Sequence, residues 1–407
     1  MKLRALCTSL ALLLLCANAT AQAPKPGSLS YRGKVYDAAS LPAELGPLVR
    51  KAVETWVPWA AKHGYRLDLD PTRRVLLLSN RDDVDAPMGL VIKTLALFDS
   101  LFPAAITPSP SAPPAAPVAK ASKPKPDESP GDVIPEDPES PPPGAPKTLA
   151  PSRDEAVTVA SAVSFRPDSQ TAVMLIAKNS ADYEAALAHL AAAHAYLAEW
   201  KTEATKQIGF ALGDPLCGAY NENSPGQEEW NPDNELVHRT MALLVLRRFE
   251  HQPYWLHTGL CWHAEMSVCK SIYCMPYRDG FVAIGEHGGW IAALNSLFSG
   301  REKQPLRVDE IAIVRGTWDD KRSKAALGMV DFLARLNPRA LSGFMEELRQ
   351  TRELNSRVTN VDGTWTRNTK YEVANDTQKQ LLEKYFGAKV MSEVIAYWTT
   401  GAITPVK

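Results

Sequence analysis

Half of the prolines in this chain fall in one stretch, and that stretch divides the rest of the sequence. Residues 103–151 contain 16 of the 32 prolines, and no aromatic residue occurs from Pro103 to Ser164. Such a segment cannot bury enough apolar surface to offset the entropy lost on ordering. We therefore expect a Pro-rich disordered linker over residues 103–152, either a plain inserted spacer or a polyproline ligand for an aromatic groove. An N-terminal α/β segment, residues 24–102, precedes it.

The first 23 residues are typical of an export signal. Lys2 and Arg4 precede an apolar run, residues 6–17, which is too short to span a bilayer as a mature helix. Alternating alanines follow, and cleavage after Ala23 is favoured over the two earlier alanines. The sequence therefore predicts a signal peptide over residues 1–23 and an exported protein, periplasmic or extracellular. No integral membrane segment is expected after cleavage.

Export would place the four remaining cysteines in an oxidising compartment, where disulfides form. These are Cys217, Cys261, Cys269 and Cys274. Four cysteines allow three pairings, and the sequence alone does not choose among them. We favour Cys269–Cys274 as a local link and Cys217–Cys261 as a longer one. The spacing of the last three is not that of a zinc ribbon.

The charge balance argues against a nucleic-acid partner. The chain has 45 Lys and Arg against 46 Asp and Glu, a net charge of −1. No basic excess is available to neutralise phosphates.

The hydrophobic pattern predicts strands and helices before the linker and again after it. Strands are expected at residues 74–79, 171–177, 208–212 and 217–220. Asn80 is expected to cap a helix before the linker, and an alanine-rich helix is expected to run to about Trp200. Further helices are expected at residues 232–249, 254–269, 288–298, 319–336, 338–352, 376–386 and 389–399. This order predicts an α+β fold, with a small mixed sheet followed by a mostly helical half.

Two blocks in the helical half contain candidate chemistry. The first is Asn-Glu-Leu-Val-His at residues 234–238, and the second is Trp-Leu-His-Thr-Gly-Leu at residues 255–260. Together they resemble the gluzincin zinc metallopeptidases, especially the secreted peptidase MA-like proteins. In that family H-E-x-x-H lies on one helix and W-L-x-E-G-L-A on the next. The resemblance implies a zincin-like fold and a gluzincin-like domain over residues 153–407.

In such a site two histidines at i and i+4 bind zinc, the glutamate beside the first polarises the zinc-bound water, and a carboxylate on the next helix completes the site. The chain departs from this pattern at two of the four positions. Asn234 and Thr258 replace the first histidine and the third ligand, whereas Glu235 keeps the general-base position and His238 the second-ligand position. A single imidazole cannot hold zinc, because amide and hydroxyl groups are poor donors. No cofactor is expected on this basis.

Replacement ligands are a second possibility. His257, Cys261 and Glu265 follow one another at helical spacing and could form a rewired metal site with His238. His257, however, lies about 100° around the helix axis from Thr258. Glu235 and His238 also have structural interpretations that need no catalytic role. A glutamate is favourable at the positive N-terminal end of a helix, and His238 can be a hydrogen-bonded histidine of the protein interior.

The sequence leaves three hypotheses. The favoured one is an exported pseudopeptidase that has lost its zinc site and binds a peptide or protein in the old substrate cleft, or serves a structural role. The alternative is an active metal-dependent peptidase or hydrolase with a rewired metal site. The third sets the resemblance aside and leaves a helical secreted domain. Whether the chain is an enzyme is therefore open.

Overall fold

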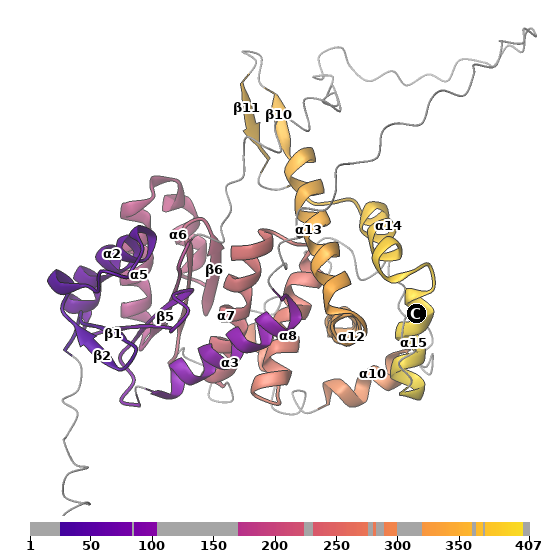
Figure 1. Cartoon of the computed structure of the whole chain (residues 1–407), viewed down its shortest axis with the longest axis horizontal. Coiled ribbons are helices and arrows are strands. Elements are labelled where there is room, and N and C mark those ends of the chain that lie inside the picture. The colour runs from indigo at the N-terminus through magenta and orange to yellow at the C-terminus, as the bar shows by residue number, and fades with distance from the viewer. Residues whose placement is uncertain are drawn as a thin grey trace, which may run out of the picture.

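The structure is a computed structural model. It describes residues 25–83, 85–103, 170–223, 231–275, 280–281, 289–298, 320–359, 364–368 and 371–401. These residues form eleven α-helices and a seven-stranded mixed sheet, together with two short hairpins (Figure 1). The expected succession of a mixed sheet and then a mostly helical half is confirmed, because the last strand of the sheet ends at Asn221 and helices dominate from Pro232 onward.

The sheet has the spatial order β2-β1-β3-β4-β5-β7-β6. Its strands are β1 Leu29–Tyr31, β2 Lys34–Tyr36, β3 Arg66–Leu69, β4 Val75–Ser79, β5 Ala172–Ala177, β6 Gly209–Gly213 and β7 Leu216–Asn221. The pairs β1–β3, β4–β5 and β5–β7 are parallel, and the other neighbours are antiparallel. Four of these strands were predicted. The other three, β1 to β3, have three or four residues each, too few to show a hydrophobic period.

Both faces of the central strands are covered by helices. Along β4, Val75 and Leu77 point into one hydrophobic core, whereas Leu76 and Leu78 point into the other. One face packs against α2 (Pro47–His63), α5 (Ser180–Ala193) and α6 (Ala198–Ala204), and the other against α3 (Asp85–Leu101) and α7 (Pro232–Phe249). Burial on both faces explains why β4 and β5 are continuous apolar runs instead of alternating ones.

The two strands on either side of the predicted linker are neighbours in the sheet. β4 pairs in parallel with β5, with Val75 opposite Ala172. Two consecutive arginines of α7 hold the ends of this long connection. Arg247 Nε donates to the Gln170 carbonyl at 2.7 Å, and Arg248 donates to the carbonyl of Pro103 at 3.3 Å. Residues before and after the connection therefore share one sheet and one core.

The helical half follows the predicted boundaries closely. Its helices are α7 (Pro232–Phe249), α8 (Tyr254–Val268), α10 (Trp290–Phe298), α12 (Asp320–Leu336), α13 (Pro338–Asn355), α14 (Asn375–Phe386) and α15 (Val390–Thr400). Each boundary lies within three residues of its expected position. Two short hairpins were not predicted, one formed by β8 (Cys274–Met275) and β9 (Gly280–Phe281), the other by β10 (Arg357–Thr359) and β11 (Trp365–Arg367).

Helices α7 and α8 form a hairpin joined by residues 250–253, and α8 also packs against α12. The contact with α12 is close at Gly259. A Cβ at this position would lie 2.7 Å from Val330 Cγ2 and 3.0 Å from the Ala326 carbonyl oxygen. Only glycine allows the two helices this approach, so α8 is held firmly between α7 and α12.

Two local predictions were wrong. The alanine-rich helix does not reach Trp200 unbroken: α5 ends at Ala193, His194 adopts extended backbone, and α6 starts after a 3-10 turn, η3 (Ala195–Leu197). The helix before the linker is not capped by Asn80. Asp83 Oδ1 accepts instead from the amides of Asp85 and Ala86, at 3.1 and 3.2 Å. The helix begins at Asp85, five residues after Asn80, so Asn80 is too far from its first turn to cap it.

The predicted signal peptide, residues 1–23, lies outside the described residues, as does the predicted linker, residues 103–152, beyond Pro103. Within the described helices, none combines the length and the apolar character that crossing a membrane requires.

Candidate functional site

The start of α7 is fixed by its own sequence, as predicted. Asn231 Oδ1 accepts from the amide of Asp233 at 3.0 Å, and Pro232 occupies the first helical position. This cap places Asn234, Glu235 and His238 in the first two turns. All three side chains are buried in the protein, with exposed fractions of 4% or less.

The hairpin geometry decides which residue of α8 faces them. His238 lies eleven residues before the end of α7 at Phe249, and Glu265 lies eleven residues after the start of α8 at Tyr254. Because the helices run in opposite directions, these two residues are level with each other. Thr258 is only four residues into α8, about 10 Å back along the axis at 1.5 Å per residue.

Glu265, and not Thr258, is therefore the residue of α8 that lies opposite His238. The resemblance had assigned that position, the third zinc ligand, to Thr258. Glu265 Oε1 lies 2.7 Å from His238 Nδ1, and its Oε2 accepts from Asn234 Nδ2 at 2.9 Å. Oε2 also accepts from the backbone amides of Tyr273 at 2.9 Å and Cys274 at 3.4 Å. The amide and imidazole at the two family ligand positions are thus both hydrogen-bonded to one fully buried carboxyl group.

Burial favours the uncharged forms of this pair. Desolvation raises the pKa of Glu265 to about 8, with the nearby Glu235 charge adding to the rise. Desolvation, together with the Arg239 charge, lowers the pKa of His238 to about 3. Both pKa shifts favour the uncharged form of the group, because burial penalises the charge on each partner.

Glu235, at the general-base position, has both oxygens engaged. Oε1 accepts from Arg239 Nε at 2.7 Å, one turn later on α7, and Oε2 accepts from the Cys274 thiol at 2.7 Å. Burial alone would raise the pKa of Glu235, but the Arg239 charge and the thiol hydrogen bond outweigh it, and the pKa lies below its ordinary value. Glu235 is an ionised, paired carboxylate within the core.

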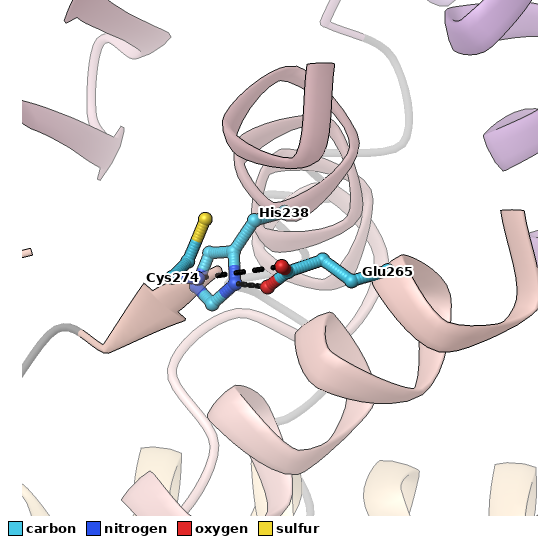
Figure 2. A group of neighbouring side chains, drawn as sticks. All are labelled: His238, Glu265 and Cys274. Carbon is cyan, nitrogen blue, oxygen red and sulfur yellow. Dashed lines mark hydrogen bonds and ion pairs between the residues drawn. The ribbon is translucent and has the colours of Figure 1, made fainter. Parts of the chain in front are cut away.

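Three groups able to bind a metal converge at this point (Figure 2). The donor atoms of His238, Glu265 and Cys274 all lie within 4.8 Å of one another, and all three residues are buried. They come from α7, α8 and β8 respectively. Of the replacement ligands considered from sequence, only Glu265 joins this group. Its position follows from the predicted helix ends, whereas nothing in the spacing pointed to Cys274, which follows a turn after α8.

A pocket of about 320 Å³ lies along the same helix pair, nearer to the connection between α7 and α8. Its wall includes His238 and Arg239 from α7 and His257 and Thr258 from α8. Other parts of the wall come from residues 251–254, from Arg352 on α13 and from residues 371–373. His238 thus belongs to both the buried cluster and the pocket wall.

The predicted disulfides are wrong in this structure, since all four cysteines are free thiols. Cys217 lies in β7 and Cys261 in the middle of α8, and both are buried in different hydrophobic cores. Cys269 follows α8, and its thiol faces the Asp233 carbonyl at 3.9 Å, whereas the thiol of Cys274 faces Glu235. The number of cysteines and the expected oxidising compartment suggested pairs that the fold does not bring together.

The zinc site implied by the resemblance does not fit these residues. Asn234 and Thr258 supply an amide and a hydroxyl, both poor zinc donors, and Asn234 Nδ2 is already committed to Glu265 and to the Ser271 carbonyl. In comparisons with known proteins, the chain matches no protein-family model and no curated protein sequence.

Proposed function

We propose that this protein is an exported, non-catalytic relative of the gluzincin peptidases, acting in the periplasm or outside the cell, and that its pocket binds a peptide or a protein segment. The proposal keeps the family resemblance of the two helix blocks and changes the role of the site. Binding replaces hydrolysis as the activity.

One observation carries the proposal. Asn234 and His238, at the two ligand positions of the motif helix, are both hydrogen-bonded to Glu265 inside the core. A peptidase needs these positions to hold zinc and to leave one coordination site open for water. Glu235 supports the same conclusion, because both of its oxygens are occupied and neither is free to take a proton from a water molecule.

The neighbouring pocket supports a binding role. Its volume of about 320 Å³ is at the lower end of the range for ligand sites and suits one or two amino-acid side chains. The wall offers hydrogen-bonding groups of both kinds, including Arg239, His257 and Glu372. Such a mixed wall suits the alternating amides and side chains of a peptide.

The test is an enrichment experiment with the full chain and a mixture of tryptic peptides from casein, read by mass spectrometry. We expect a subset of peptides to be retained and returned uncut, with or without added zinc. His251→Trp, which enlarges a side chain of the pocket wall, should abolish retention, and Lys206→Trp, at an exposed side chain outside the pocket wall, should not. Absence of any retained peptide would count against binding.

A second function, metal-dependent hydrolysis through a rewired site, is favoured by the convergence of the His238, Glu265 and Cys274 donor atoms beside the pocket. This function predicts shortened peptides in the same experiment when zinc is present. Cleavage would then disappear in His238→Ala. Intact peptides in all zinc-loaded samples exclude it.

A further inference from the structure

We propose that His238, Glu265 and Cys274 form a binding site for one thiophilic divalent cation, best suited to zinc, and that this cation has a structural role. The ligand set differs from that of the gluzincin motif, which uses positions 234, 238 and 258. The proposal does not rest on peptide binding, although His238 also belongs to the pocket wall.

The spacing of the donors suits a small cation. A tetrahedral zinc with bonds of about 2.0 Å to nitrogen and oxygen and about 2.3 Å to sulfur holds its ligand atoms roughly 3.3–3.6 Å apart. The three donor atoms here lie within 4.8 Å of one another without a metal. A shift of about an ångström in side chains would bring them to bonding distance.

A fourth donor stands beside the sulfur. Glu235 Oε2 lies 2.7 Å from Cys274 Sγ, while Oε1 remains with Arg239. Glu235 is not one of the residues whose donor atoms all lie within 4.8 Å of one another, so its side chain would have to turn toward the cation to complete four-coordination. Four protein donors would then fill the site, as is typical of structural zinc, whereas a catalytic zinc keeps one position open.

The donor types select the cation. One thiolate and one imidazole favour zinc and its softer neighbours over magnesium or calcium, which prefer sites made only of oxygen. The three main ligands come from α7, α8 and β8, and β8 is a two-residue strand that lies outside the seven-stranded sheet and pairs with β9. The cation would therefore link residues 271–275 to helices α7 and α8, as a cross-link does.

The experiment uses cobalt(II) as a spectroscopic probe on the full chain, stripped with a chelator and kept reduced. Wild type should bind one equivalent, with near-ultraviolet sulfur-to-cobalt charge transfer and the visible bands of a tetrahedral site. Cys274→Ser should lose the charge-transfer absorption. His238→Ala and Glu265→Gln should weaken binding by about 100-fold or more, since each removes one ligand. The matched control, Cys269→Ser, should keep both absorption and affinity.

A structural cation also raises the melting temperature, so zinc should stabilise wild type and Cys269→Ser by several degrees and leave Cys274→Ser unchanged. Folded wild type that shows no charge-transfer absorption with excess cobalt overturns the proposal, whatever the variants do. Retention of the absorption in folded Cys274→Ser, checked by far-ultraviolet circular dichroism, overturns it as well. Neither result bears on peptide retention, which tests the function separately.

Discussion

The two ends of the α7–α8 hairpin make opposite use of polar side chains. At the cluster end, which comprises Asn234, Glu235, His238, Glu265 and Cys274, the polar groups are buried and bonded to one another. At the pocket end, near residues 250–258, polar groups line a cavity of about 320 Å³. The resemblance to peptidases had assigned both ends to a single catalytic site.

This difference separates two tasks that a zinc peptidase combines. Satisfied buried polar groups specify how elements pack, and unfilled cavities with polar walls bind ligands. A change at the cluster end should therefore affect folding more than binding, and a change at the pocket end should do the reverse. The following predictions test that division.

The largest effect is expected for Glu265→Ala in metal-free protein. The substitution leaves His238, the Asn234 amide and the Tyr273 N–H without their partner, and it should lower the free energy of unfolding by about 2–4 kcal/mol. The pocket-end control His257→Ala should cost less than about 1 kcal/mol. Urea unfolding measures both free energies. Equal losses of stability in Glu265→Ala and His257→Ala would show that the two ends of the hairpin do not differ in their contribution to folding.

Gly259→Ala tests how firmly α8 is held in register between the two ends. The added Cβ would meet Val330 Cγ2 at 2.7 Å, so we expect a loss of about 1–3 kcal/mol in the free energy of unfolding. Gly89→Ala is the matched control, because its Cβ would meet nothing within 4 Å in α3 and should stabilise the protein by about 0.5–1 kcal/mol. Similar changes in the free energy of unfolding for the two variants would show that α8 can shift relative to α12 to accommodate the added methyl group.

A third prediction concerns the two-turn offset between Thr258 and Glu265. In a Cys274→Ser background, Asn234→His should restore zinc binding through the introduced imidazole, His238 and Glu265. We expect affinity to rise at least about tenfold, or about 1.4 kcal/mol, by calorimetric titration. Adding Thr258→Glu should bring no further gain. A gain that requires Thr258→Glu would place the third ligand at the pocket end after all.

The smallest effect on stability is expected from Asp331, a carboxylate of α12 that contacts His263 of α8. Asp331 of α12 contacts His263 Nδ1 at 3.1 Å and Arg335 Nε at 2.8 Å. Burial alone would raise the pKa of Asp331, but these partners outweigh it and hold the pKa below 3.8. The stabilisation is therefore present above pH 3.8 and is lost as pH falls through the lower, folded-state pKa.

Asp331→Asn should thus reduce the free energy of unfolding by about 1 kcal/mol at neutral pH. The difference between wild type and variant should shrink as pH falls below 3.8, which urea unfolding over a pH series measures. A difference that stays constant with pH would show that the ionised form of Asp331 contributes nothing.

The helices were predictable because their signals are local. Asn231 and Pro232 mark the start of α7, and the connection at residues 250–253 separates α7 from α8. Those same boundaries already placed Glu265 level with His238, so this contact was available from the sequence by counting residues from the turn. The family pattern drew attention to Thr258 instead.

Cys274 and the short strands were not predictable in the same way. The position of Cys274 depends on the turn after α8, where Trp262 Nε1 donates to the Cys274 carbonyl and Glu265 accepts from the Tyr273 amide. These contacts form only when α8 is already packed. Strands such as β1 are too short for a period and are defined by pairing with β3, which is a tertiary event.

The parallel pairing of β4 with β5 joins the residues before Pro103 to those after Gln170 through the sheet as well as through the chain. Arg247 and Arg248, both on α7, donate hydrogen bonds to the carbonyls of Gln170 and Pro103. Buried side chains on both faces of the sheet set the register of β4 and β5. A protein cut once in that interval would become two fragments that reassociate as one molecule. The site between α7 and α8 would then belong wholly to the second fragment, while the sheet behind it would be shared by both.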